Sequence, residues 1–420
     1  SHAFQRVIRG RTERGLTPHP PSPPEAVERG ADRSHGRSNF WTWRTAMYEA
    51  ANRLTPDDLH AVARMCFREM VRAGITAVGE FHYLHRDPDG RAYADPAELE
   101  RRVLAAAGEV GLRVVLLRTA YARAGHGLAP EPLQRRFVEE SPDAYLRGLE
   151  ATVAAAAGEP LATVGIAPHS VRACPAEWIR ALSDEARRRG MPLHLHAAEQ
   201  PAEVAACKDE HGASPIGLLD RLGALGERTT VVHAIHLDDA DVRLLGGSRT
   251  TVCVCPTTER NLGDGIAPVD RLVAAGAPLA LGTDSNAQID PLEDARELEY
   301  HLRLARLERA VLDQPRGSLA QRLLDAATAG GMAALGLRGG RLAPGEPADF
   351  VAVDLADPTI AGAGSDDLLP LVVFALGRTA IRDVFVAGEP VLVEGTPTAA
   401  SMPDAQVVAE FRRAMRHLWG

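Results

Sequence analysis

The 420-residue sequence has little of what marks several large classes of protein. Its five cysteines are scattered and form no C-x-x-C pair, which argues against a disulfide framework and favours a reducing, cytoplasmic compartment. Lysine occurs only at Lys208 and the formal net charge is −9, so nothing favours a nucleic-acid partner. No apolar run approaches the length of a membrane-spanning helix, and we therefore expect no membrane association.

The sequence instead has repeated strand-like and helix-like segments. Hydrophobic residues make up 45% of it, enough for a substantial core. Short, apolar, β-branched runs alternate with segments of helical period, and they occupy residues 74–81, 112–121, 162–170, 192–199, 229–235, 250–255 and 277–285. Nearly continuous apolar strands separated by helices predict an α/β fold with a parallel sheet.

The helical segments have clear start and stop signals. Residues 55–74 begin with a threonine cap followed by proline and end at glycine, and residues 141–158 and 174–190 repeat this pattern. With an eighth strand expected ahead of Ser1, these units predict a closed (β/α)₈ barrel, and an open doubly wound sheet is the alternative. No G-x-G-x-x-G or Walker-type loop supports a nucleotide-binding fold.

Polar residues end several of the predicted strands. They are His169, His196 with Glu199 three residues later, His233 and Asp284. The carboxyl ends of barrel strands converge on one face, where catalytic residues collect. A single histidine at a strand end is more often structural, but its repetition over several strands predicts a site that binds metal and moves protons.

Other polar residues are expected to be structural or remain ambiguous. We expect His194 to point away from His196, toward the helices, and Cys253 and Cys255 to be packed in a strand. His2, in the opening "SHAFQR", would complete an H-x-H pair if a histidine preceded Ser1, and the chain reads as incomplete at this end. Considered alone, a histidine this close to a terminus is better explained by an exposed position at a frayed end.

Several motifs resemble the amidohydrolase superfamily and, within it, the formimidoylglutamate deiminases. They are HAFQR (2–6), FWTWR (40–44), GEFHYLH (79–85), HLHAAEQ (194–200), CPTTERNLGDGI (255–266) and GTDSN (282–286). The resemblance implies a catalytic barrel over residues 1–335. It also implies the C-terminal part of a small β-sandwich over 336–400, which begins near GGRLAPGEPADFVAVD (339–354), and a C-terminal helix over 401–420.

The resemblance further implies a single divalent metal, most plausibly Zn²⁺, bound by His2, His196, Asp284 and a histidine preceding Ser1. Binuclear relatives use a lysine after the fourth barrel strand, where this chain has His169, so a mononuclear site is expected. The same donors also suit iron and other divalent ions.

The implied reaction is hydrolytic deimination of N-formimidoyl-L-glutamate, in histidine degradation, to N-formyl-L-glutamate and ammonia. A metal lowers the pKa of a bound water, His233 and Asp284 would orient and deprotonate that water, and Glu199 would pass a proton to the leaving nitrogen. The substrate is a dianion, and arginine can bind carboxylates through two hydrogen bonds. The resemblance points to Arg44 and Arg172 for this role, with Gln5, Tyr83 and His169 as further substrate-binding candidates.

Two other functions stay open. One is a related deaminase acting on a nucleobase-like ring, although aromatic residues are only 5% of the chain. The other is an inactive, truncated or metal-free fragment that only binds ligands.

The resemblance also makes a homodimer plausible. The Pro-rich residues 17–38 are expected to be extended, and their histidines, His19 and His35, are not expected to bind metal.

Overall fold

The computed structural model describes residues 1–13, 38–398 and 401–420. The Pro-rich stretch 17–38, with His19 and His35, therefore lies outside the described residues except for its last residue. No helix in the described ranges is both long enough and apolar enough to cross a membrane.

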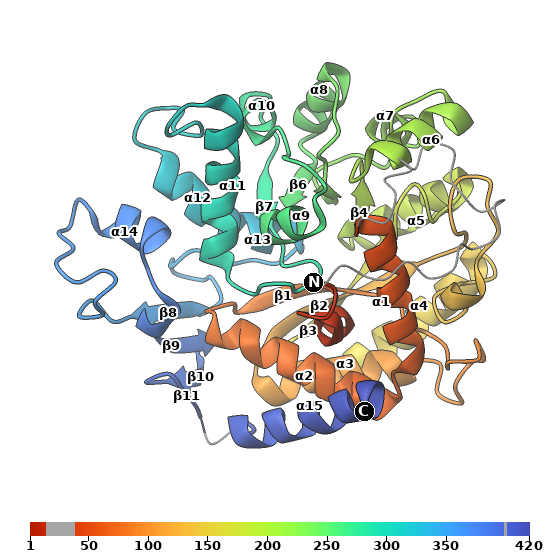
Figure 1. Ribbon diagram of the computed structural model, residues 1–420, viewed down its shortest axis with the longest axis horizontal. Helices are drawn as coiled ribbons and strands as arrows, with labels where there is room; N and C mark the ends of the chain where they lie inside the picture. Colours follow the sequence, from red (N-terminus) through yellow and green to blue (C-terminus); the bar gives the residue numbers. More distant parts are fainter. Residues whose placement is uncertain (14–37, 399–400) are drawn as a thin grey trace.

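The main sheet has seven parallel strands that pair in chain order (Figure 1). These strands are β1 (Ala77–His82), β2 (Arg113–Ala120), β3 (Ala162–Pro168), β4 (Leu193–Ala197), β5 (Thr229–His233), β6 (Thr251–Val254) and β7 (Leu279–Leu281). Each falls within a predicted strand or within one residue of it. The sheet curls into an open barrel with helices around it, which confirms the predicted fold class and excludes the doubly wound alternative.

The first two residues lie between β1 and the segment that follows β7. The Ser1 ammonium group donates to the carbonyl oxygen of Gly79 at 3.0 Å, and the Phe81 N–H donates to the carbonyl oxygen of Ser1 at 2.7 Å. On the other side, the His2 N–H donates to the carbonyl oxygen of Asp284 at 2.8 Å. These backbone bonds place His2 at the mouth of the barrel, and 3₁₀ helix η1 (Ala3–Ile8) follows it.

Helices connect the strands and cover the barrel. They are α1 (Phe40–Arg53), α2 (Pro56–Arg72), α3 (Glu98–Val110), α4 (Pro142–Ala156), α5 (Ala176–Arg189), α6 (Pro201–His211), α7 (Pro215–Arg221), α8 (Asp239–Ser248), α9 (Pro256–Leu262), α10 (Val269–Ala274), α11 (Pro291–Arg306), α12 (Leu319–Ala327) and α13 (Ala329–Ala334), with a 3₁₀ turn η2 (Pro132–Gln134). Their ends follow from local chemistry. Thr55 and Asp58 form a reciprocal capping box at the start of α2, and Gly190 ends α5 with a φ of 66°.

The lower end of the barrel is closed by the end of α13, and this corrects the expectation for His194. Residues two apart in an extended strand share a face, so His194 points into the barrel with His196, and Leu195 points outward. His194 lies deeper in the barrel, where its Nε2 is 2.7 Å from the carbonyl oxygen of Ala334. The predicted direction was wrong, and the contact is a structural one.

A second, antiparallel sheet lies beside the barrel (Figure 1). It contains β8 (Phe350–Val353), β9 (Ile381–Val386), β10 (Glu389–Val393) and β11 (Thr396–Pro397), with α14 (Leu368–Phe374) and the 3₁₀ turn η3 (Arg378–Ala380) between β8 and β9. The rings of Phe350 and Phe385 stack across the β8–β9 pair at 4.4 Å between centroids.

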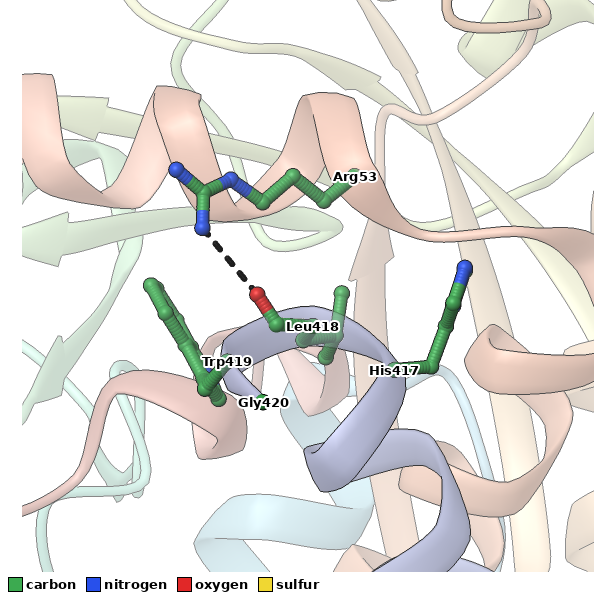
Figure 2. A pocket seen from close by; sticks show the side chains of 5 residues that line it. All are labelled: Arg53, His417, Leu418, Trp419 and Gly420. Carbon is green, nitrogen blue, oxygen red and sulfur yellow. Dashed lines mark hydrogen bonds between the residues drawn. The ribbon is translucent and has the colours of Figure 1, made fainter.

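The C-terminal helix α15 (Asp404–Trp419) returns to the barrel and packs along α2. Figure 2 shows how its end meets α1: the Arg53 guanidinium donates to the carbonyl oxygen of Leu418 at 3.0 Å. The guanidinium groups of Arg11 and Arg53 also lie over the Trp419 ring, at 4.6 and 5.1 Å from its centroid. The chain's last helix thus joins the segment after η1 to α1, the helix that carries Arg44.

Candidate active site

Three side chains that could bind a metal ion converge at the mouth of the barrel. His2 comes from the start of the chain, His196 from β4, and Asp284 from the segment after β7. The His2 Nε2 lies 3.4 Å from the His196 Nε2 and 3.2 Å from the Asp284 Oδ1, and the His196 Nε2 lies 3.5 Å from that same oxygen. All three residues are buried, so this is a compact donor set taken from distant parts of the sequence.

The hydrogen bonds around the histidines suit a cation. The His2 Nδ1 lies 2.9 Å from the carbonyl oxygen of Phe81, and the His196 Nδ1 lies 3.0 Å from that of His169. A carbonyl oxygen only accepts, so each Nδ1 carries the proton and each neutral ring presents a bare Nε2. Two lone pairs and a carboxylate oxygen then face one another within 3.5 Å without a hydrogen-bond donor, an arrangement that a divalent cation would stabilise.

The electrostatics favour the charge states that bind metals. Burial lowers the pKa of His2 below its usual value, which favours the neutral ring. Burial alone would raise the pKa of Asp284, but its contacts with His196 and His2 outweigh this and hold the pKa well below the usual range. Neutral histidines and an ionised carboxylate are the forms that bind a metal ion.

Glu199 and His233 lie next to this donor set. The His233 Nε2 is 3.4 Å from Glu199 Oε1 and 4.0 Å from Asp284 Oδ2. Burial would lower the pKa of His233, but the carboxylates of Glu199, Glu259 and Asp284 outweigh it and raise that pKa well above its usual value. A cation bound beside Asp284 would oppose this effect.

The backbone at two of these strand ends is unusual. His233 has a φ of 74° and Asp284 a φ of 39°, in the left-handed region that residues other than glycine rarely adopt. Such conformations cost about 1–3 kcal/mol each and persist where the surroundings fix them, which happens most often at functional sites. Here they turn both side chains toward the barrel mouth.

A cavity of about 40 Å³ opens next to the donor set. It is lined by His2, Gln5, Phe40, Trp43, Arg44, Met47, Tyr48, Tyr83, His169, Arg172, His196, Glu199, Leu262 and Asp284. The cavity lining therefore includes every side chain predicted for the site except His233. His233 does not line the cavity, but it contacts the site through Glu199 and Asp284. The individual roles of these residues remain predictions.

Two guanidinium groups lie against the aromatic side chains of α1. The Arg44 Cζ is 4.5 Å from the centroid of the Trp41 ring, and the Arg172 Cζ is 5.7 Å from that of Phe40. In the described part of the chain, the Arg44 NH1 and the Arg172 Nε and NH1 are buried and have no acceptor. Burial would lower the pKa of Arg172, but the carboxylates of Glu203 and Glu199 raise it above its usual value, so the group is cationic.

The remaining predicted substrate ligands are neutral. Gln5 donates through Nε2 to the Tyr83 hydroxyl at 3.1 Å, which leaves the Gln5 Oε1 buried without a donor among the described residues. The His169 ring stacks on that of His196 at 5.1 Å between centroids, and its Nδ1 is 3.1 Å from the Ser170 hydroxyl. Burial holds the pKa of His169 well below its usual value, so this ring is neutral.

Some residues of the site were not singled out in the sequence. Phe40, Trp43, Met47 and Tyr48 line the cavity from α1, with Arg44 among them. Their spacing of three and four residues marks one helical face, and this signal was available beside the FWTWR motif. The first part of the CPTTERNLGDGI motif forms helix α9. Glu259 in that helix contacts His233.

Comparison with known proteins agrees with this geometry. The Amidohydrolase family model matches residues 28–391. Formimidoylglutamate deiminase from Pseudomonas aeruginosa is 40% identical over 401 residues, covering 94% of this chain and 83% of that protein. A 5-methylthioadenosine/S-adenosylhomocysteine deaminase from Natronomonas pharaonis is 31% identical over 347 residues, covering 81% of this chain and 72% of that protein.

Solved structures give the same family. The crystal structure of an amidohydrolase from Brucella melitensis superposes with a TM-score of 0.88 at 34% identity, covering 100% of this chain and 88% of that one. An adenosine deaminase from Xanthomonas campestris, solved with bound zinc, shares the fold with a TM-score of 0.77 at 24% identity, covering 99% of this chain and 83% of the other. The chain belongs to the amidohydrolase family and is a hydrolase that acts on carbon–nitrogen bonds.

Proposed function

We propose that this protein hydrolyses N-formimidoyl-L-glutamate to N-formyl-L-glutamate and ammonia, with a bound divalent cation, Zn²⁺ being the expected ion. The observation that carries the proposal is the pair of buried guanidinium groups, Arg44 and Arg172, with N–H donors that have no acceptor in the described structure. They line the same cavity as the metal-type ligands. A substrate with carboxylates at one end and an amidine at the other would satisfy both sets of groups.

The neutral side chains support the same orientation. The Gln5 Oε1 has no donor in the described structure, and the N–H groups of a formimidoyl substituent would supply one. An unpaired polar group buried in a site disfavours any ligand that cannot bond to it, by about 1–3 kcal/mol. The identity of 40% to formimidoylglutamate deiminase supports this assignment, against about 31% to a deaminase of the nucleoside type.

The proposed reaction assigns a role to each polar group near the reacting carbon. A divalent cation held by His2, His196 and Asp284 would lower the pKa of a water bound to it. Water adds to the formimidoyl carbon and forms a C–O bond, while Asp284, with His233 orienting the water, takes one of its protons. That proton passes through Glu199 to the terminal nitrogen, and Glu199 then moves the remaining hydroxyl proton to the same nitrogen as the C=O bond forms. The C–N bond breaks, ammonia leaves, and the formyl product remains.

The aromatic lining of the cavity favours one competing candidate. Phe40, Trp43, Tyr48 and Tyr83 could contact a flat ring, as a deaminase of nucleosides or nucleobases requires. However, the guanidinium groups of Arg44 and Arg172 lie beside two aromatic rings of α1, Trp41 and Phe40. A ligand bound on this side of the cavity therefore meets two positive charges, which favours an anionic ligand over a neutral ring. Guanine is included in the test because it also has an amidine-like carbon.

The test is ammonia release from a panel of substrates by the zinc-loaded chain. We expect kcat/KM for N-formimidoyl-L-glutamate to exceed that for guanine, S-adenosylhomocysteine and 5-methylthioadenosine by at least about 10³-fold. Formimidoylglycine, which lacks the side-chain carboxylate, separates amidine recognition from dianion recognition. Turnover of a ring substrate with none of the formimidoyl compound would reject the proposal and select the competing one.

A further inference from the structure

Glu259 is a buried carboxylate behind His233, on the side away from the cavity. It lies in the first turn of α9 and is almost fully buried. Its Oε1 is 3.2 Å from the His233 Nδ1 and also accepts the backbone N–H of Cys255 at 2.9 Å. The second bond fixes the carboxylate to the backbone at the start of its own helix, so its position does not depend on the imidazole.

The opposite nitrogen of the ring is placed for chemistry. The His233 Nε2 is buried, has no hydrogen-bond partner in the described structure, and lies 3.4 Å from Glu199 Oε1. A carboxylate oxygen only accepts, so the His233 Nδ1 must carry a proton for the contact with Glu259 to be favourable. The other ring nitrogen, Nε2, then faces Glu199 and Asp284.

We propose that Glu259 is the positioning residue that holds the proton of His233 on Nδ1 and thereby directs Nε2 toward the reacting water. The inference rests on the proposed function for its kinetic consequences, but the tautomer itself is a property of the chain. Glu259 does not touch the cavity. It acts only through the imidazole, as the carboxylate of a carboxylate–histidine pair does in other hydrolases.

The direct test is the tautomer of His233 in the zinc-loaded protein, followed by NMR of ¹⁵N-histidine-labelled protein. The His233 signals are identified by their loss in a His233→Asn variant. We expect the proton of the neutral ring to lie on Nδ1 in the wild type. In Glu259→Ala the Nδ1 partner is gone, and we expect the ring to populate the other tautomer. Glu259→Gln retains an acceptor oxygen and should preserve the wild-type pattern better.

Kinetics give the second readout. We expect Glu259→Ala to lower kcat by about 10²-fold with KM changed by less than about threefold, and Glu259→Gln to recover a large part of that loss. The matched control is Glu299 in α11, which is buried and accepts the backbone N–H groups of Val311 and Leu312. Glu299→Gln should leave both kcat and the His233 signals unchanged.

The outcomes separate the two proposals. An unchanged His233 tautomer in Glu259→Ala would overturn the inference, whether or not kcat falls. A shifted tautomer with an unchanged kcat would also overturn it, because the imidazole orientation would then have no catalytic consequence. A wild-type chain that releases ammonia from none of the substrates would reject the proposed function, and the NMR result would still decide whether Glu259 fixes the tautomer.

Discussion

The Nε2 atoms of His2 and His196 lie 3.4 Å apart although the residues are 194 positions apart in the sequence. A hydrogen bond from Nδ1 to a backbone carbonyl oxygen orients each ring. His2 donates to the carbonyl oxygen of Phe81, and His196 donates to that of His169. The approach of two bare nitrogens is unfavourable unless a cation lies between them.

Cation binding should depend on Asp284 and contribute to stability. We expect the chain to bind one divalent cation, and Zn²⁺ at 100 times its dissociation constant to stabilise the fold by about 2.7 kcal/mol. Asp284→Asn should lose the bound metal and the chelator-dependent shift in thermal unfolding, because a charged ligand is removed. The measurement is metal content by elemental analysis, with unfolding recorded before and after chelation.

A second group of side chains that could bind a metal ion provides the control for the metal-content measurement. His126, Glu210 and His211 also bring donor atoms together, but Arg123 already donates to Glu210 at 2.8 Å and supplies the positive charge. Glu210→Gln should therefore leave metal content unchanged. Equal metal content in Asp284→Asn and the wild type would contradict the assignment of the site.

Arg172 should contribute mainly to substrate affinity. Hydrogen bonds to charged groups are worth about 1.5–3 kcal/mol, so Arg172→Met should lower kcat/KM by about 10- to 100-fold, largely through KM. The measurement is steady-state kinetics with the dianionic substrate. Arg382→Met is the control, since Arg382 is half-exposed on β9 and pairs with Glu394 at 2.9 Å. Similar KM values in the two variants would remove Arg172 from the substrate site.

Trp419 should stabilise the fold by joining α15 to α1. Truncation to alanine removes the ring between the guanidinium groups of Arg11 and Arg53, and we expect a loss of about 2 kcal/mol in the free energy of unfolding. Urea unfolding measures this directly. Leu304→Ala is the control, because Leu304 is 75% exposed and its loss should change stability by less than about 0.5 kcal/mol. Equal effects would show that α15 docks without Trp419.

Stability should fall in mild acid partly because of His194. Burial lowers the pKa of His194 to about 4, from about 6.5 in the unfolded chain. Between these values the unfolded state binds a proton that the folded state does not, so the free energy of unfolding decreases as pH falls from about 6.5 toward 4. One such group contributes at most about 1.4 kcal/mol per pH unit.

The matched variant is His194→Gln, which can still donate to the carbonyl oxygen of Ala334 but does not titrate. Urea unfolding at pH 7 and pH 5, in the presence of a chelator, should show a smaller acid loss in this variant than in the wild type. Above pH 6.5 the two proteins should have the same pH dependence. Identical acid losses would mean that His194 does not contribute to the linkage.

The barrel could be predicted because its signals are local. Alternating apolar runs and capped helices give the strands and helices, and parallel strands place His169, His196, His233 and Asp284 at one edge. The position of His2 could not be derived this way, since it depends on backbone bonds to Gly79, Phe81 and Asp284 that no periodicity encodes. Its place in the site was an implication of the family resemblance.

The features that were predicted wrongly, or not predicted, each have a physical reason. The direction of His194 was predicted wrongly because the two-residue period of a strand was applied with the wrong parity. Helix α9 has only seven residues and was not among the predicted helices, and Glu259 was not considered as a partner of His233. Which side chains of α1 face the cavity depends on how the helix packs over the barrel mouth, which helical period alone does not settle.

The most direct test of the account is the kcat of Glu199→Gln for N-formimidoyl-L-glutamate, measured at equal metal content and equal thermal stability. Glutamine has the shape of glutamate but cannot pass a proton, so we predict that kcat falls by about 10²- to 10⁴-fold. Glu210→Gln, on the outer surface, should retain wild-type activity. A folded, metal-loaded Glu199→Gln that keeps the wild-type kcat would contradict the claim that Glu199 moves a proton in this site.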